Sequence, residues 1–146
     1  MNAQDRLEIA DALARYGHVV DRGQLDRLDS VFTPDVRYDM SAVGLPVMAG
    51  VDALRQGALR LGAQNPVAHH VTDITVLEAG DDEAVVESKG LMLTVEGTLR
   101  SVTHSDVLRR TPDGWRIASR TITPQTVPLG GLLDTCLLYT SDAADE

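Results

Sequence analysis

The sequence predicts an α+β fold in which helices near the N-terminus are followed by a curved antiparallel or mixed sheet that wraps around them. Two observations support this prediction. Apolar residues recur at helical spacing up to about residue 61, and from Pro66 onward they alternate as in strands. Strong turn signals divide this second part into four strands. The expected order is α-α-β-α-β-β-β-β, and helices gathered before a meander of strands are typical of an α+β domain.

The first part of the chain is expected to hold three helices and one short strand. Asn2 can cap the first helix, whose apolar stripe continues to about Val20. A second, short helix is expected over residues 25–32, because Thr33-Pro34-Asp35 follows it as a stop signal. The remaining elements are a strand at 36–40, a loop at 41–50 and a third helix at 51–61.

The second part is expected to form a meander whose turns are marked by glycine, proline and acidic residues. The turns are expected at residues 80–82, 96–97 and 111–114. The strands between them are expected at 70–77, 84–95, 98–110 and 115–123. A curved sheet wrapped around one long helix would leave a concave, partly apolar pocket, a common setting for a small-molecule site.

The length and composition are those of a single globular domain. The chain has 146 residues, of which 43% are hydrophobic and 24% charged. We expect one domain over residues 1–125 and an irregular segment over 126–135. Residues 136–146 resemble the translation of a sequencing adaptor, as if a metagenomic read had run into it. We therefore expect this last segment to be an artefact, with the natural C-terminus lying beyond view.

The charge and the apolar runs exclude several classes of partner. The net charge is −9 and no basic stripe is present, so the sequence predicts no nucleic-acid partner. No apolar run approaches the roughly 18 residues of a membrane span, and the N-terminus lacks the pattern of a signal peptide. We therefore expect a cytoplasmic protein without a membrane partner. A single cysteine, Cys136, excludes an internal disulfide.

Four short motifs resemble those of the SnoaL-like branch of the nuclear-transport-factor-2-like superfamily. They are the segments Arg15–Leu28, Val31–Val36, His69–Asp73 and Asp113–Arg120, in the family's order and spacing. The resemblance spans roughly residues 3–123 and implies a cone-shaped fold. It implies less about the reaction, because this fold hosts many chemistries.

The resemblance also implies a set of site residues. In the scytalone and bile-acid dehydratases of this superfamily, an Asp after the first helix pairs with a His at the start of a long strand, and Asp21 and His70 are similar to these positions. Tyr16 resembles a first-helix Tyr that binds substrate oxygen, and Arg120 resembles an Arg on the last strand. The chain departs from the dehydratase pattern at Met40, where a Tyr is usual, and the pattern's second His has Thr94 or a neighbour in its place.

The residue types themselves fit proton transfer. An imidazole titrates near pH 6.5, so His70 could take and return a proton at neutral pH, with the Asp21 carboxylate fixing its tautomer. A core histidine with an ordinary hydrogen bond is the alternative. His69 is expected on the opposite face of the strand and therefore in a structural role. Adjacent strand residues cannot ligate one ion together, so we expect no metal and no other cofactor.

Further candidates would line the substrate pocket. His104 alternates with Val102 on its strand, so the two are expected on one face. Candidates for substrate binding are therefore His104, Arg120, Met40, Val102 and Thr94. By analogy with the family, a homodimer is expected through the outer face of the sheet, with Leu91 and Leu93 as candidate contacts.

Together these expectations predict a cofactor-independent lyase or isomerase. Its substrate would be a small, largely apolar, oxygenated molecule such as a steroid, terpenoid or polyketide-like compound. His70 would abstract a proton next to a carbonyl, and Tyr16 would hold the oxygen that gains charge. An aldol cyclase of polyketides remains open, and so does a non-catalytic domain that binds a small ligand or a partner chain.

Overall fold

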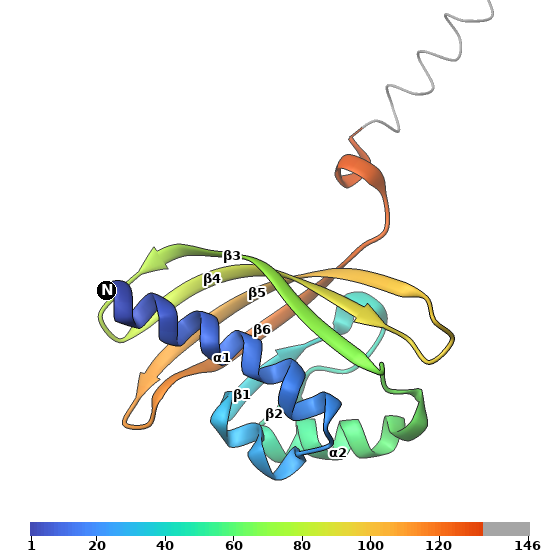
Figure 1. The fold of residues 1–146 in the computed structure, drawn as a ribbon, viewed down its shortest axis with the longest axis horizontal. Helices are drawn as coiled ribbons and strands as arrows, with labels where there is room; N and C mark the ends of the chain where they lie inside the picture. Colours follow the sequence, from blue (N-terminus) through green and yellow to red (C-terminus); the bar gives the residue numbers. More distant parts are fainter. Residues whose placement is uncertain (133–146) are drawn as a thin grey trace, which may run out of the picture.

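The protein folds as an α+β domain, seen in a computed structural model that describes residues 1–132 (Figure 1). One six-stranded mixed sheet has the strand order β2-β1-β6-β5-β4-β3. The predicted fold class is thus confirmed. The adaptor-like segment 136–146 and the end of the segment 126–135 lie outside the described residues, so these two boundaries stay predictions.

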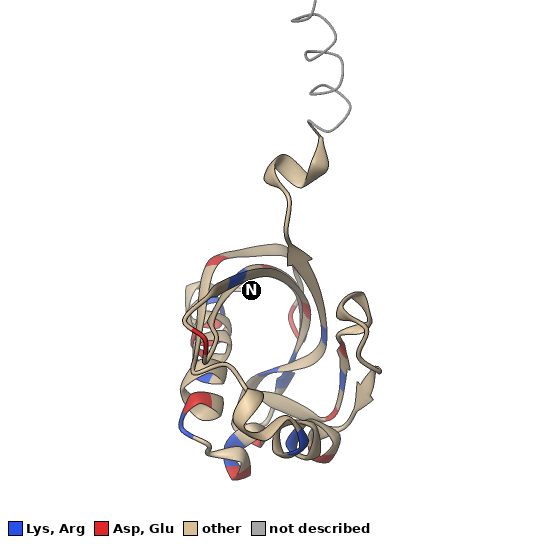
Figure 2. Cartoon of the chain, turned by 90° about the vertical axis from the view of Figure 1, so that its right-hand side faces the viewer, with Lys and Arg blue, Asp and Glu red and all other residues tan. Residues whose placement is uncertain are grey.

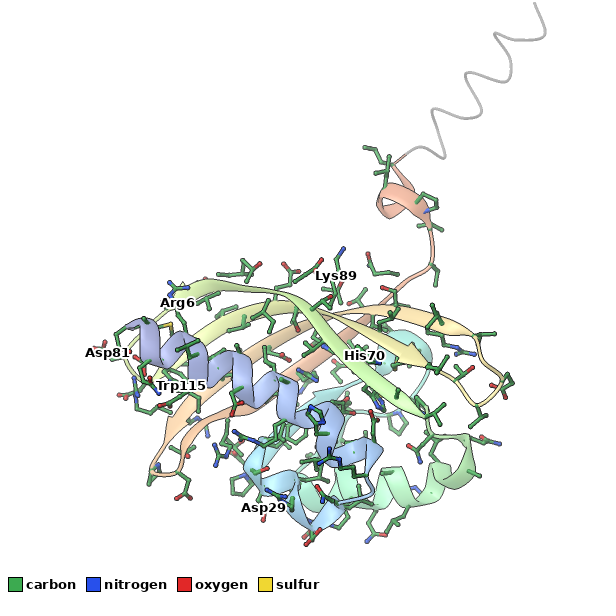
Figure 3. The ribbon with its side chains drawn as sticks, in the orientation of Figure 1. Arg6, Asp29, His70, Asp81, Lys89 and Trp115 are labelled. Carbon is green, nitrogen blue, oxygen red and sulfur yellow. The ribbon has the colours of Figure 1, made fainter. Side chains whose placement is uncertain are left out.

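The long first helix, α1 (Ala3–Asp21), begins with a reciprocal cap. The Asn2 side chain accepts the backbone N–H of Asp5 at 2.9 Å, and the Asp5 carboxylate accepts the backbone N–H of Asn2 at 3.1 Å. The same carboxylate accepts the indole N–H of Trp115 at 3.1 Å and pairs with Arg110 at 2.9 Å. Hydrogen bonding from Arg110, followed by that from Asn2 and Trp115, lowers the pKa of Asp5. This network joins the start of α1 to the last hairpin, and Trp115 lies beside α1 in Figure 3.

The strands of the second part form the predicted meander. Their bounds are β3 (Ala68–Ala79), β4 (Glu83–Leu93), β5 (Leu99–Thr111) and β6 (Gly114–Gln125). Each pairs antiparallel with the next, and β6 also pairs in parallel with β1 (Phe32–Asp39). The mixed character of the sheet comes from this one parallel contact.

The sheet curls strongly, as the end-on view in Figure 2 shows. Irregularities in the pairing register accompany the bending. One is on β6, where Ala118 has no partner on β5, and another is on β3 at Asp73, whose φ is +55°. Bulges bend a strand and increase its twist, which suits a sheet that closes around a helix. Helix α1 contacts β3 and β6 and so lies inside the curve.

The segment between the first helix and the meander differs from expectation in several details. The second helix is a 3-10 helix, η1 (Leu25–Ser30). Strand β1 begins earlier than predicted, at Phe32. A two-residue strand, β2 (Met48–Ala49), pairs with β1 inside the segment predicted as a loop. Helix α2 (Val51–Leu61) has the predicted bounds and packs against β1, β2 and η1.

The core fills the space between the inner face of the sheet and the two α-helices. Fully buried members include Ile9, Leu13, Phe32, Val36, Val86, Leu108, Trp115 and Ile117. Polar residues also point inward, since Ser88, His104, Asp106 and Arg120 are all buried. Among the described residues no helix is long and apolar enough to span a bilayer.

Candidate active site

A carboxylate–imidazole pair links the end of α1 to the start of β3. Asp21, the last residue of α1, accepts from the backbone N–H of His69 at 2.9 Å with one oxygen. Its other oxygen lies 2.6 Å from Nδ1 of His69. The side chains are 22% and 13% exposed, so the pair is largely shielded from water. Two contacts from one carboxylate fix both the backbone and the ring of His69.

The expected contact between Asp21 and His70 is wrong, because the partner is the neighbouring His69. Successive side chains of a strand point to opposite faces, and β3 begins at Ala68 with His69 turned inward. His70 is exposed, and Figure 3 marks its place on β3. The expectation that His69 lies on the outer face is wrong for the same reason. A shift of one residue exchanges the two faces of a strand.

Gly17 allows this pair to form. It is buried on α1, one turn before Asp21, where the helix crosses β3. A Cβ atom at this position would lie 2.6 Å from the carbonyl oxygen of His69. The helix can therefore approach the strand closely only without a side chain here, and this approach brings the Asp21 carboxylate within reach of His69.

Two tyrosine hydroxyls meet beside His69. Tyr16 on α1 and Tyr38 on β1 have hydroxyl oxygens 3.3 Å apart. The Tyr16 ring is edge-on to that of His69, with centroids 5.4 Å apart. Because one hydroxyl donates to the other, the pair keeps one O–H that can donate to a third oxygen. Burial, followed by the nearby Tyr16, raises the pKa of Tyr38 well above its usual value, so this hydroxyl stays protonated.

A buried ion pair supports the two tyrosines. The Nε and Nη2 atoms of Arg120 on β6 each donate to one oxygen of Asp106 on β5 at 2.8 Å. The carbon of the guanidinium lies 5.4 Å from the Tyr16 ring centre. Burial opposes the charge of Arg120, but the Asp106 carboxylate outweighs it and raises the pKa of Arg120. A guanidinium whose charge is matched by the Asp106 carboxylate therefore lies against the ring of Tyr16.

His104 on β5 completes the inward-facing polar cluster. Its Nδ1 lies 3.4 Å from the Ser88 hydroxyl, and the residue is 8% exposed. Burial, then the charge of Arg120 and the neighbouring His69, lowers the pKa of His104 to about 2. The ring is therefore neutral at any physiological pH. It can donate and accept hydrogen bonds, but it cannot store a proton.

The other predicted pocket residues divide into two groups. Val102 is buried beside His104 on the inner face of β5, and Met40 packs against the core at the end of β1. Thr94 instead lies in the turn after β4, where its hydroxyl is 2.7 Å from that of Thr98. Thr94 thus belongs to the hairpin and not to the cluster.

Sequence reasoning missed three members of the cluster: His69, Tyr38 and Asp106. The family pattern places a Tyr at the position of Met40. Tyr38 lies two residues earlier and on the same face, so aligning the pattern two residues earlier would have identified it. Asp106 follows His104 at the same spacing of two. Within residues 1–132, no three His, Cys, Asp or Glu side chains come together as ligands for a metal.

Comparisons with known proteins agree with this arrangement of elements. An uncharacterized protein of Mycobacterium tuberculosis is 33% identical over 126 residues, which cover 80% of this chain and 82% of that protein. An NTF2-like protein with a cystatin-like fold from Novosphingobium aromaticivorans is 28% identical with a TM-score of 0.71, covering 86% of this chain and 85% of that one.

A third similar protein has a more specific description. It is a candidate scytalone dehydratase from Novosphingobium aromaticivorans, 17% identical with a TM-score of 0.72, and the match covers 84% of this chain and 85% of that one. At this identity the likeness concerns the fold alone. The family model described as SnoaL-like domain matches residues 1–121, which is most of the chain. The chain therefore belongs to the SnoaL-like domain family, as its four motifs led us to expect.

Proposed function

We propose that the protein is a cofactor-independent proton-transfer enzyme, a lyase or isomerase of the dehydratase type. Its substrate would be a small, largely apolar molecule with a carbonyl oxygen, of steroid, terpenoid or polyketide-like size. The observation that carries this proposal is the 2.6 Å contact between Asp21 and Nδ1 of His69, next to two tyrosine hydroxyls. A carboxylate on one ring nitrogen leaves the other nitrogen free to act as a base.

The proposed reaction begins with removal of a proton by His69. Its Nε2 takes a proton from the carbon next to the carbonyl, while Nδ1–H donates to Asp21 and stabilises the imidazolium. The C–H electron pair moves toward the carbonyl oxygen, which becomes an enolate oxygen. The spare O–H of the Tyr16 and Tyr38 pair donates to this oxygen, and Arg120, held by Asp106, supports the ring of Tyr16 from the side.

The second half of the reaction returns the proton held by the imidazolium. In an isomerisation, His69 gives the proton back to another carbon. In a dehydration, the C–O bond on the neighbouring carbon breaks, and the leaving hydroxide takes the proton to form water. In an aldol cyclisation, the enolate carbon attacks a second carbonyl, whose electron pair moves to its oxygen, and that alkoxide takes the proton from His69. All three begin with the same proton abstraction, so the first test concerns that step.

The test uses exchange of α-protons for deuterium in D₂O, followed by NMR on a panel of cyclic ketones such as 1-tetralone. We expect the wild type to accelerate exchange and His69→Ala to reduce that acceleration at least about 100-fold, the usual range for a general base. His70→Ala is the matched control and should leave exchange unchanged, because His70 is exposed on the outer face.

Other outcomes would redirect the assignment. Exchange that depends on His70 and not on His69 would contradict the proposed base. A wild type that binds these ketones without exchanging their protons would favour the non-catalytic ligand-binding domain of the same fold.

We also propose that the protein acts as a homodimer whose contact is the outer face of the sheet. The outward residues of β5 and β6 around the middle of the sheet are uncharged: Ser101, Thr103, Ser105, Val107, Ser119, Thr121 and Thr123. Leu91 and Leu93 on β4 are 38% and 36% exposed beside them. In a chain with a net charge of −9, this uncharged band of β5 and β6 reduces like-charge repulsion between two copies, although Glu87, Lys89 and Arg37 on the neighbouring strands flank it.

A further inference from the structure

A second group of charged side chains lines a groove between α1 and the turn that joins β5 to β6. The groove has a volume of about 430 Å³. Helix α1 contributes Glu8, Asp11 and Arg15, which share one face of the helix, and residues 110–116 form the other wall. These residues are all different from those of the candidate active site, so the groove is a separate feature of the molecule.

Two arginines lie side by side in this groove because consecutive carbonyl groups hold them. Arg15 donates from Nη1 to the carbonyl oxygen of Ser30 at 2.7 Å, and Arg116 donates from Nε to that of Asp29 at 3.1 Å. Asp29 and Ser30 are the last two residues of η1, and carbonyl groups at the end of a helix lack partners within the helix. The end of η1 therefore holds two positive charges close together.

The two arginines differ in how their charge is balanced. Arg15 forms an ion pair with Asp11 on the same helix. Within residues 1–132, Arg116 forms no ion pair, and its Nη1 donates to the carbonyl oxygen of Trp115 at 2.9 Å. Burial, followed by the charge of Arg15, lowers the pKa of Arg116, and Asp113 opposes this only in part. A guanidinium has five N–H donors, so Arg116 keeps donors for an added carboxylate.

A carboxylate lies across Gly114 from the guanidinium of Arg116. A Cβ atom on Gly114 would be 3.4 Å from Nη1 of Arg116 and 3.9 Å from Oε2 of Glu8. Oε1 of Glu8 accepts from the side-chain amide of Gln4 at 3.2 Å, so Oε2 is the oxygen turned toward Gly114. The φ of Gly114 is +110°, which L side chains rarely adopt, so glycine keeps this space open. Opposite charges thus face each other here, and among the described residues they do not pair.

We propose that this groove binds a small zwitterion of the amino-acid type. Its carboxylate accepts from Arg116, beside the charge of Arg15, and its ammonium donates to Glu8. One carbon separates the two charged groups of an α-amino acid, so each can reach its opposite charge across Gly114. A simple anion would be repelled by Glu8 and Asp113, and a simple cation by the two arginines. The matching ligand therefore carries both charges.

The test compares three probes at pH 7 by NMR titration. L-alanine carries both charges, propionate carries the carboxylate alone, and ethylammonium carries the ammonium alone. The reporters are the backbone amides around the groove and the indole N–H of Trp115, the one tryptophan of the chain. We expect L-alanine to bind about tenfold more tightly than either of the other probes, the effect of one charge-assisted hydrogen bond.

Two variants each remove one of the two charges. Glu8→Gln should reduce the preference for L-alanine over propionate to about one without weakening propionate. Arg116→Met should reduce the preference for L-alanine over ethylammonium to about one. The matched controls are Glu87→Gln and Arg109→Met, which change exposed residues of β4 and β5 outside the groove and should keep both tenfold ratios.

Glu8→Gln decides the matter if Arg116→Met does not fold, because it replaces the carboxylate with an amide of the same shape. Equal affinities of the wild type for the three probes, or no binding of L-alanine, would overturn the inference. A preference over propionate that survives in Glu8→Gln would overturn it as well. So would L-alanine shifts that appear around His69 and not around Trp115. The inference does not depend on the proposed proton transfer, because none of these variants changes Asp21 or His69.

Discussion

The Arg120–Asp106 pair places two opposite charges in the interior, where each is balanced by the other and not by water. The side chains are 1% and 0% exposed, and both oxygens of the carboxylate are used. Removing one partner leaves the other charge buried alone, which typically costs about 3–5 kcal/mol. Replacing both partners with apolar groups of similar volume is often neutral, because no unpaired charge remains.

We therefore expect Asp106→Leu and Arg120→Met each to lower the free energy of unfolding by about 3–5 kcal/mol, measured by urea denaturation. The double variant should recover most of that loss. Arg109→Met is the control: its partner Asp35 is exposed, so a change below about 1 kcal/mol is expected. Additive losses in the double variant would mean that the two groups act separately, against the paired geometry.

The recovered stability would not restore the proposed reaction. Arg120 also lies against the ring of Tyr16 and near Tyr38. A double variant that unfolds like the wild type but no longer exchanges ketone protons would assign Arg120 to the support of the hydroxyl pair. A fully active double variant would leave the ion pair with a role in stability alone.

The same kind of local detail limits what the sequence could predict about the site. The residue types and the partner on α1 were predicted, since Asp21 does hold a histidine at the start of β3. The choice between His69 and His70 was wrong because the resemblance did not fix the pleat of β3 to within one residue. Tertiary packing decides which residues of β3 face the core, both at its start and after the bulge at Asp73. Alternation in the sequence alone does not reveal this.

The crossing of α1 over β3 is set by Gly17. Helix propensity alone predicts that Gly17→Ala stabilises a helix by up to about 1 kcal/mol. We expect the opposite sign here, a loss of about 1–3 kcal/mol, because the new methyl group would clash with the His69 carbonyl and push the helix outward. Thermal and urea unfolding would measure it.

Ala14→Gly on the exposed face of the same helix calibrates the propensity effect alone. Gly17→Ala should also weaken ketone exchange, since the helix carries Asp21. A variant that is more stable than the wild type and keeps full exchange would show that α1 can move without breaking the Asp21–His69 contact.

The elements themselves were predicted more reliably than the site. Helix α2 has the predicted bounds, and the three hairpin turns of the meander were correctly placed by their glycine, proline and acidic residues. Strand β2 was missed because two residues, Met48 and Ala49, are too few for an alternating pattern. Such a strand exists only because β1 offers an edge, which is a tertiary effect.

The proposed dimer connects the charge of the chain with the shape of its sheet. A stable interface buries at least about 1,000 Å² in total, and the uncharged band of β5 and β6 is the proposed centre of that contact, with Leu91 and Leu93 beside it. The inner face cannot serve this purpose because α1 and the core cover it. The two faces would thus have separate tasks, with substrate inside and the second copy outside.

We expect sedimentation equilibrium to give twice the mass of one chain for the wild type. Thr103→Arg on β5 would place a like charge on both copies at the centre of the contact, so it should shift the protein to the monomer. Thr75→Arg, an exposed change on the edge strand β3, is the matched control and should remain dimeric. A monomeric wild type would contradict the proposed contact. A dimer that tolerates Thr103→Arg would place the contact elsewhere, and the uncharged residues of β5 and β6 would then need another explanation.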